Sequence, residues 1–236
     1  MSYLIERSAE SEWMDDFSIS SPDLKETLKN ITFINKYFGG HRSVILGLSE
    51  IFNLNYFSSK KSIRIVEIGC GLGDNLLVIE HKFGKKFKLE LVGIDANQTI
   101  IEEAKSNDSL NKIEFICSTL NSTNITEIEA DVLVFGLFLH HFSEVEITSL
   151  LNKIDPRRVK SIIISDLQRS TFSLFLFKLA SAVFNFNKMA YNDGIISIKK
   201  GFTLKEINGY LDAMKIEPLV LKKVFGFRIL MVGILK

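Results

Sequence analysis

The sequence is short of proline and cysteine and has almost no net charge. Of its 236 residues, three are proline and two are cysteine, and the formal charge at neutral pH is +1. The cysteines, Cys70 and Cys117, stand in no metal-ligand spacing and no secretory signal opens the chain, so we expect a reducing, cytoplasmic setting and no metal site. The lack of a basic tail or an arginine-rich stripe argues against nucleic acid as a partner.

Long apolar runs are also absent. No stretch approaches the roughly 18–20 apolar residues that span a bilayer, so we expect no stable membrane insertion. Hydrophobic residues nevertheless make up 46% of the chain, which is enough for a full core. A chain of this length suits one large domain, or one domain with a cap, and leaves a homodimer open.

Helical and strand patterns alternate along the chain. Two helices come first: one opens at Ser21-Pro22 and stops at Gly39-Gly40, and the second carries apolar residues from Val44 to Phe52. Five short apolar runs, separated by helices, then predict strands at Ile63–Ile68, Lys88–Ile94, Lys112–Ile116, Asp131–Gly136 and Ser161–Ser165. Strands that are apolar throughout are buried on both faces, as in parallel sheets of α/β proteins.

The last quarter of the chain has a different pattern. Thr203-Leu204-Lys205-Glu206 is a capping box, like Ser143-Glu144-Val145-Glu146 earlier in the chain, and each box predicts the start of a helix. Two strands follow at Ile216–Val224 and Phe227–Leu235, joined only by Phe225-Gly226. This join is too short for a crossover connection, so the two strands must be antiparallel.

A glycine-rich loop follows the first predicted strand. It reads Gly69-Cys70-Gly71-Leu72-Gly73, with Glu67 before it and Asp74 after it. A strand, a glycine turn and a helix form a nucleotide-binding architecture, because glycine lets the backbone turn sharply and lets a ligand lie against it. Asp95 ends the next predicted strand, where a carboxylate can accept hydrogen bonds from both hydroxyls of a ribose. A tight turn that binds nothing is the alternative.

The spacing of the glycines separates two classes of ligand. In the dinucleotide fingerprint the third glycine stands one place after Gly73, where this chain has Asp74. The Asp74 carboxylate would repel a pyrophosphate. Together with Glu67 it suits a ligand that has a cationic amine and a sulfonium. We therefore predict S-adenosylmethionine as the cofactor and S-adenosylhomocysteine as its product.

These motifs resemble those of the class I, Rossmann-like S-adenosylmethionine-dependent methyltransferases. The resemblance runs from Ile63 to the end of the chain. It implies an α/β fold with a seven-stranded, mostly parallel sheet, a C-terminal antiparallel hairpin and a helical cap. It also implies a cofactor site at the ends of the first four strands, formed by Glu67, Gly69, Cys70, Gly71, Gly73, Asp95, Ala96, Asn97, Ser118, Thr119, Leu120, Gly136 and Leu137.

More local motifs resemble a bacterial branch of that family that acts on small molecules. They are Met14-Asp15, the set Asn35, Gly39, Gly40 and Arg42, the segment Asp166-Leu167-Gln168-Arg169-Ser170, and Asp193-Gly194 with Ser197. The resemblance implies a small, hydrophobic or aromatic acceptor in secondary or lipid-like metabolism, with methylation on oxygen favoured. Arg42 is a candidate for binding the cofactor's carboxylate, and a solvated helix start is the alternative.

His140-His141 is the candidate general base for the acceptor. The pair follows the fourth predicted strand, at the edge where open α/β sheets bind ligands, and histidine titrates near neutral pH. A structural or substrate-shaping role is the alternative. Asp166 ends the fifth predicted strand at the same edge, where it can contact the acceptor or cap the local backbone. We expect Arg169 to pair with Asp166.

The stretch Thr171–Phe186 is apolar at helical spacing. We assign it to a helical lid inserted at about 168–200 in a methyltransferase domain that spans 61–236, preceded by an N-terminal helical cap at 1–60. Its apolar face either packs within the cap or lines a hydrophobic acceptor pocket. Docking on a membrane surface is disfavoured, because the helix has too little positive charge.

Other functions compete with small-molecule methylation. Enzymes that methylate base amines typically have a [DN]-P-P-[YF] motif after the fourth strand, where this chain reads Phe135-Gly136-Leu137-Phe138. This counts against nucleobase amines and leaves protein substrates open. A non-catalytic partner that binds the cofactor is a third possibility, although Glu67, the glycines and Asp95 are intact. Asp74 disfavours a dinucleotide oxidoreductase.

Overall fold

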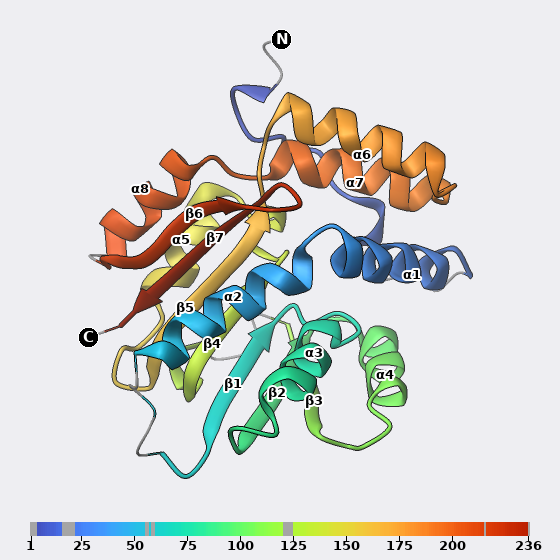
Figure 1. Cartoon of the computed structure of the whole chain (residues 1–236). Coiled ribbons are helices and arrows are strands. Elements are labelled where there is room, and N and C mark those ends of the chain that lie inside the picture. Colours follow the sequence, from blue (N-terminus) through green and yellow to red (C-terminus); the bar gives the residue numbers. More distant parts are fainter. Residues whose placement is uncertain are drawn as a thin grey trace.

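A seven-stranded sheet forms the centre of the molecule (Figure 1). The structure is a computed structural model that describes residues 4–15, 22–54, 57, 60–119, 125–214 and 216–235. The strands are β1 (Ile63–Ile68), β2 (Leu89–Asp95), β3 (Ile113–Cys117), β4 (Ala130–Gly136), β5 (Val159–Leu167), β6 (Pro218–Val224) and β7 (Arg228–Ile234). Their order is β3-β2-β1-β4-β5-β7-β6. The first five strands are parallel and β7 is antiparallel to both of its neighbours, which confirms the predicted terminal hairpin.

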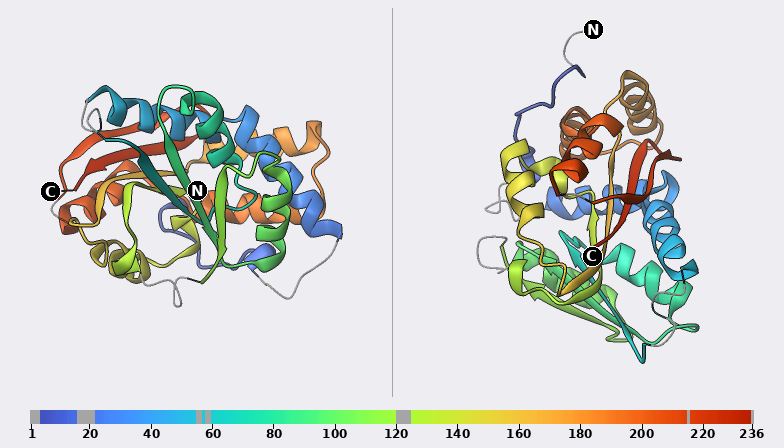
Figure 2. Two further views of the ribbon diagram at one scale, coloured as in Figure 1. Left: turned by 90° about the horizontal axis from the view of Figure 1, so that it is seen from below. Right: turned by 90° about the vertical axis from the view of Figure 1, so that its left-hand side faces the viewer.

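Helices cover both faces of this sheet. They are α1 (Pro22–Tyr37), α2 (Gly40–Asn53), α3 (Asp74–Phe83), α4 (Gln98–Asn107), α5 (Glu144–Asn152), α6 (Thr171–Val183), α7 (Lys188–Lys200) and α8 (Leu204–Met214). One core layer joins the sheet to α2, α3 and α4, and the other joins it to α5 and α8. Figure 2 (right) shows the sheet between α2 and α5. Alternate residues of β4 supply the two layers, Val132 and Val134 on one face and Leu133 and Phe135 on the other.

Most predicted elements are confirmed to within two residues. β1 has the predicted bounds, and both capping boxes form: Ser143 and Thr203 each accept a hydrogen bond from the amide of the glutamate three residues later. The N-cap predicted at Ser21 lies outside the described residues. The sequence does not predict α7 as a separate helix, because Asp193-Gly194 near its centre is typical of a turn.

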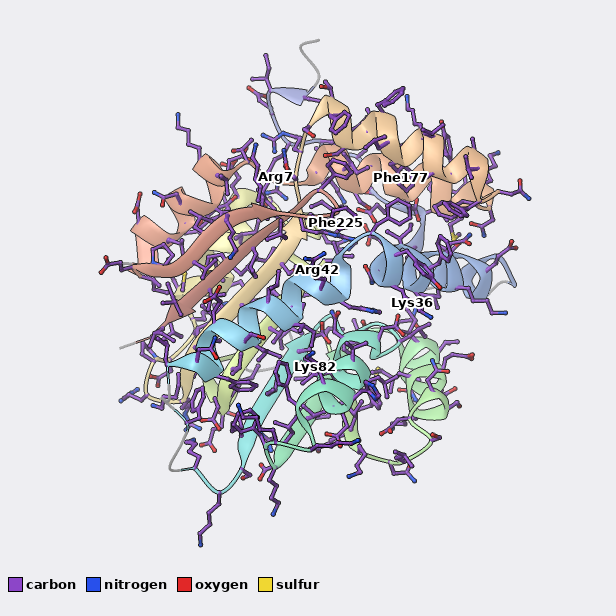
Figure 3. The ribbon with its side chains drawn as sticks, in the orientation of Figure 1. Arg7, Lys36, Arg42, Lys82, Phe177 and Phe225 are labelled. Carbon is purple, nitrogen blue, oxygen red and sulfur yellow. The ribbon has the colours of Figure 1, made fainter. Side chains whose placement is uncertain are left out.

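α6 and α7 pack side by side beyond the carboxyl ends of the strands (Figure 1). Gly194 permits their close approach, since a Cβ at this position would collide with the ring of Phe177. Phe177 lies between α6 and α1 (Figure 3) and is the α6 residue that reaches the cavity described below. The outer face of α6 leaves Phe172, Phe175 and Leu179 exposed. Most of the predicted apolar face therefore lines no acceptor pocket.

The first two helices have different places in the fold. α2 packs against β5 and β7, whereas α1 packs against α7 beyond the strand ends. The border predicted at residue 60 between a cap and a methyltransferase domain stays a prediction. In the described part of the chain, no helix combines the length and the apolar character that crossing a membrane requires.

Arg7 fastens the N-terminal strap, defined here as residues 4–15, to the rest of the molecule. Its Nε donates to the carbonyl oxygen of Lys200 at 2.8 Å, and its Nη2 donates to those of His140 and Phe142 at 3.1 and 2.8 Å. The guanidinium also lies 4.4 Å from the centroid of the Phe202 ring, a cation–π distance. One side chain thus joins the strap to α7 and to the segment after β4.

Asp193 of α7 holds the far end of the strap. Its carboxylate accepts hydrogen bonds from the amides of Trp13 at 2.9 Å and Met14 at 3.0 Å. This role accounts for the aspartate of the Asp193-Gly194 motif, as close packing accounts for its glycine. The anchored strap brings Glu12 and Asp15 to the carboxyl edge of the sheet.

Arg7→Met is expected to free the strap without disturbing the sheet. Loss of hydrogen bonds from a charged donor corresponds to roughly 2 kcal/mol, or about 30-fold in local opening. Hydrogen exchange should therefore accelerate about 30-fold at the amides of Ser8, Trp13 and Met14, while the amides of β4 keep their protection. Glu6→Met, at an exposed neighbour, is the control. Unchanged exchange at those three amides would show that other contacts hold the strap.

Candidate active site

A cavity of about 740 Å³ opens at the carboxyl edge of the sheet, within the size range of small-molecule sites. The segments after β1, β2, β3 and β4 form one part of its wall, and α1, α7 and the strap form most of the rest, with single residues such as Phe177 of α6 and Arg228 of β7. The predicted site residues that line it are Glu67, Gly69, Cys70, Gly71, Asp95, Ala96, Asn97, Ser118, Thr119, Gly136, Leu137, His140 and His141. Leu120 lies outside the described residues. The glycine loop and the histidine pair therefore share one space.

The glycine loop turns through left-handed backbone conformations, with φ of +69° at Gly69, +53° at Gly71 and +75° at Gly73. A Cβ at Gly71 would meet open space, so a ligand can lie against the backbone there. Gly73 does not line the cavity; it precedes the first turn of α3, and a Cβ there would lie 2.6 Å from the Phe115 ring. Gly71 thus leaves room for a ligand, and Gly73 leaves room for the ring of Phe115.

Glu67 and Asn75 form a buried pair behind the glycine loop. Asn75 Nδ2 donates to Glu67 Oε1 at 2.7 Å, while Glu67 Oε2 and Asn75 Oδ1 find no hydrogen-bond partner in the part of the chain that the structure describes. Burial raises the pKa of Glu67 to about 8; the hydrogen bond from Asn75 opposes this rise, and the carboxylates of Asp74 and Asp95 add to it. Glu67 is therefore largely protonated at neutral pH, and a cationic ligand would favour its ionised form.

Asp95 ties the end of β2 to the glycine loop. Its Oδ2 accepts a hydrogen bond from the amide of Gly71 at 3.0 Å, and its Oδ1 accepts one from the amide of Asn97 at 3.0 Å. A carboxylate has further lone pairs, so Asp95 can still accept hydrogen bonds from a ligand. The Asn97 side chain caps α4 by accepting from the amides of Thr99 and Ile100.

A strained residue leads from β4 to the histidine pair. Leu137 has φ of +54°, which is uncommon for a residue other than glycine, and its amide donates to the carbonyl oxygen of Ser165 at 2.9 Å. A short 3-10 helix, η4 (Leu139–His141), follows. His140 is buried there, with Nδ1 2.7 Å from Oδ1 of Asp166. Asp166 does not line the cavity, but its side chain contacts His140, which does.

His141 pairs with the strap. Its Nδ1 lies 3.0 Å from Oδ1 of Asp15 and 3.7 Å from Oε1 of Glu12. Burial lowers the pKa of His141, but the two strap carboxylates outweigh burial and raise the pKa above its ordinary value. The ammonium of Lys200 lies 3.6 Å from the same Glu12 oxygen. The strap carboxylates thus face the Lys200 ammonium and the His141 imidazole, whose protonated form they favour.

Glu12, His140 and His141 are the described residues that come nearest to a metal-binding set. Each places one ligand atom within 4.8 Å of the other two. The Lys200 ammonium already supplies positive charge to the Glu12 oxygen of this set, and we assign no metal to it. The predicted absence of a metal stays a prediction.

Two arginines differ from their predicted places. The prediction that Arg169 pairs with Asp166 is wrong: Arg169 Nη2 lies 2.6 Å from Glu206 Oε1, and its guanidinium also donates to carbonyl oxygens of the strap and of Gly201. The capping box at the start of α8 brings Glu206 to this position. Arg42 is exposed at the start of α2 (Figure 3) and is not part of the cavity wall.

Many residues of the cavity wall are missing from the predicted site, among them Glu12, Asn75 and Arg228. Glu12 comes from a polar N-terminal segment with no motif, and Asn75 lies inside a helix, so no local signal marks them. Arg228 does have a signal, because it is the only charged residue in the apolar run Phe227–Leu235. A lone charge in a strand that is otherwise buried needs a partner or a function.

Comparison with known proteins identifies the domain that carries the glycine loop. Residues 65–157, which run from within β1 to beyond α5, match the sequence profile of a family described as a methyltransferase domain. No curated protein sequence matches the chain.

Several solved structures share the fold. The plantazolicin methyltransferase BpumL, in complex with a triazolic desmethylPZN analog and SAH, has a TM-score of 0.68 and 18% identity, over 95% of this chain and 93% of that one. The magnesium protoporphyrin IX methyltransferase of Synechocystis PCC 6803 with bound SAH has a TM-score of 0.58 and 10% identity, over 86% of each chain. An O-methyltransferase family 2 protein of Planctomyces limnophilus DSM 3776, in complex with apigenin, has a TM-score of 0.56 and 12% identity, over 84% of this chain and 62% of that one.

The sheet order and the glycine loop define the Rossmann-like fold of class I methyltransferases. The chain contains a methyltransferase domain at residues 65–157, and several solved structures that share its fold hold S-adenosylhomocysteine or S-adenosylmethionine.

Binding of S-adenosylhomocysteine is expected to release a proton from Glu67 at pH 7. The free protein holds Glu67 protonated below its pKa of about 8, and the cationic amine of the ligand favours the ionised carboxylate, so affinity rises with pH up to about 8. Calorimetric titration in two buffers that differ in ionisation enthalpy measures the released proton.

Glu67→Gln should abolish this buffer dependence, and Glu114→Gln, at an exposed position of β3, should preserve it. Binding to the wild type with equal enthalpy in both buffers would contradict the assignment.

Proposed function

We propose that this methyltransferase acts on an oxygen atom of a small, hydrophobic or aromatic acceptor. The observation that carries the proposal is the shared cavity, in which the glycine loop, the His140–Asp166 pair and several phenylalanine rings meet. A methyl donor on the loop would then face an acceptor held by the rings. The role in secondary or lipid-like metabolism, the cytoplasmic location and a homodimer stay predictions from the sequence.

The residues of the cavity fit the cofactor. Glu67 Oε2 and Asn75 Oδ1 are buried acceptor atoms without donors, which suits a ligand that brings a protonated amine and a sulfonium. We assign the ribose to Asp95. We assign the adenine to the side formed by Ala96, Asn97, Ser118 and Thr119, and the methionine part to the side formed by Glu67, Gly69, Cys70, Gly71, Gly136 and Leu137.

His140 is arranged to take a proton from the acceptor. S-adenosylmethionine, when bound, supplies a methyl group whose carbon a nucleophile can attack in line, while the bond from that carbon to the sulfonium sulfur breaks. A hydroxyl becomes a strong nucleophile as its proton leaves. Asp166 accepts a hydrogen bond from Nδ1 of His140, which leaves Nε2 as the basic nitrogen and stabilises the imidazolium that forms. Glu12 Oε1, 3.8 Å from Nε2, adds to that stabilisation.

His141 has a different proposed role. Its pairing with Asp15 at 3.0 Å holds the strap over the cavity and keeps Glu12 beside His140. We therefore infer that His141 positions the strap and His140 carries the proton.

Aromatic rings form the proposed acceptor end of the cavity. Phe138 stacks on Phe135 with ring centroids 5.9 Å apart and packs against Phe142 at 5.0 Å. Phe138, Phe142 and Phe177 all line the cavity. Such rings are rigid, exclude water and offer flat apolar surface, which suits a hydrophobic or aromatic acceptor.

A protein or peptide acceptor and a non-catalytic, cofactor-binding role are the alternatives. The similar structures do not choose among acceptors, because they are named for, or hold, groups as different as desmethylPZN analogs, magnesium protoporphyrin IX and apigenin. The acceptor must therefore be found by experiment.

Transfer of a deuterated methyl group from S-adenosylmethionine into a cell extract tests the proposed function. Mass spectrometry should find the label in a small, apolar product, and fragmentation should place it on oxygen. Asp95→Ala, which lacks the proposed ribose contact, is the negative control. Label confined to protein would favour the protein alternative, and cofactor binding without transfer to any extract fraction would favour the non-catalytic one.

His140→Ala is expected to lower turnover by about 100-fold or more while leaving the dissociation constant of S-adenosylhomocysteine unchanged, since a general base acts on the acceptor and not on the cofactor. Asp166→Asn should lower turnover less. His81→Ala, at an exposed position of α3, is the matched control. Full turnover in both His140→Ala and His141→Ala would rule out a histidine base.

A further inference from the structure

Arg228 is a buried cation in the wall of the cavity. It is the first residue of β7, only 1% exposed, and stands opposite Leu167 at the end of β5. Burial lowers the pKa of its guanidinium to about 10, and the Asp166 carboxylate opposes this shift. Arg228 therefore stays fully charged at neutral pH.

The guanidinium has few partners. Its Nη2 donates to Oδ1 of Asn35 at a long 3.3 Å, whereas Nε and Nη1 have no hydrogen-bond partner among the described residues. The carboxylate of Asp166 pairs with His140 and forms no ion pair with Arg228. A buried charge with unmade hydrogen bonds is costly, unless a ligand or water in the adjoining cavity completes them.

The surrounding backbone holds Arg228 in this place. The turn between α1 and α2 and the turn between β6 and β7 press together: a Cβ at Gly39 would collide with the carbonyl oxygen of Phe225, and one at Gly226 with that of Phe38. Figure 3 shows Phe225 in this hairpin turn close to the start of α2. Arg228 follows this turn directly and is 1% exposed, so its free donors are buried and can be completed from the cavity that it lines.

The charges around the cavity are unequal. Its wall includes the carboxylates of Glu12, Asp15, Glu67, Asp74, Asp95 and Asp193, but Arg228 is the only lysine or arginine among the described lining residues. A ligand that brings a carboxylate into this space has one favourable place for it. The planar fork of a guanidinium matches the two oxygens of a carboxylate.

We propose that Arg228 binds a carboxylate group of a ligand in the cavity. The inference rests on the proposed function, because that reaction offers two sources of the group. One is the amino-acid end of S-adenosylmethionine, and the other is an acid group on the hydrophobic acceptor. In the first case Arg228 takes the part that the sequence assigns to Arg42.

Calorimetry with two ligands tests the first source. S-adenosylhomocysteine has the carboxylate, and its decarboxylated analogue keeps the amine and the nucleoside. The wild type should bind S-adenosylhomocysteine about 10- to 100-fold more tightly than the analogue, and Arg228→Gln should remove this preference. Asp95→Ala should weaken both ligands alike, because both contain the ribose. Arg42→Gln decides between the two arginines, since loss of the preference in that variant alone would overturn the proposal.

Benzoate titrated into the complex with S-adenosylhomocysteine tests the second source. If the acceptor supplies the carboxylate, the wild-type complex binds benzoate and the Arg228→Gln complex does not. In that case both proteins bind S-adenosylhomocysteine and its decarboxylated analogue equally tightly. Benzamide, which has the same ring and no charge, is the control ligand.

The outcomes keep the two proposals apart. Equal binding of all these ligands by the wild type and Arg228→Gln would overturn the role of Arg228, with the methyltransferase function intact. A wild type that fails to bind S-adenosylhomocysteine would overturn the proposed function, and benzoate titrated into the free protein would still decide whether Arg228 binds carboxylates. Arg228→Gln removes a buried charge and should fold; the comparison of ligands on the wild type depends on no variant.

Discussion

Because helices cover both faces of the sheet, charged side chains on its central strands can meet a ligand only where the strands end. Glu67, Asp95 and Asp166 lie near the carboxyl ends of β1, β2 and β5. Each has its own compensation nearby: an amide side chain for Glu67, backbone amides for Asp95 and an imidazole for Asp166. The chemistry of the molecule is concentrated along this edge, and the cap helices and the strap enclose it.

The fold and the cofactor half of the site follow from local signals. The run Ile63–Ile68 forms a strand because it is apolar throughout, and Ser143 starts a helix because its side chain and Glu146 satisfy each other's backbone amides. The glycine loop and Asp95 are separated by one strand and one helix, and parallel pairing of β1 with β2 brings their ends together. Such features depend on residues close in sequence or on a regular sheet.

The other parts of the cavity depend on pairs of residues that no local pattern encodes. Asn35 and Arg228 are 193 residues apart, and Glu12 meets the histidine pair only because Arg7 and Asp193 fix the strap. Gly194 resembles a turn signal, yet it lies within a helix because the ring of Phe177 needs the space. Arg169 pairs with Glu206, although Asp166 is nearer in the sequence, because Asp166 is already paired with His140.

The order of the strands has a consequence for how the chain reaches this structure. β7 is the last strand in the sequence, yet it lies between β5 and β6 in the sheet. Until residues 228–234 are in place, β5 presents an unpaired, apolar edge to the surroundings. Open edges of this kind invite pairing with other chains. Pairing of the final strand thus covers the edge of β5 and at the same time places Arg228 in the cavity wall. A chain cut short in the hairpin would be prone to aggregate and would also lack Arg228.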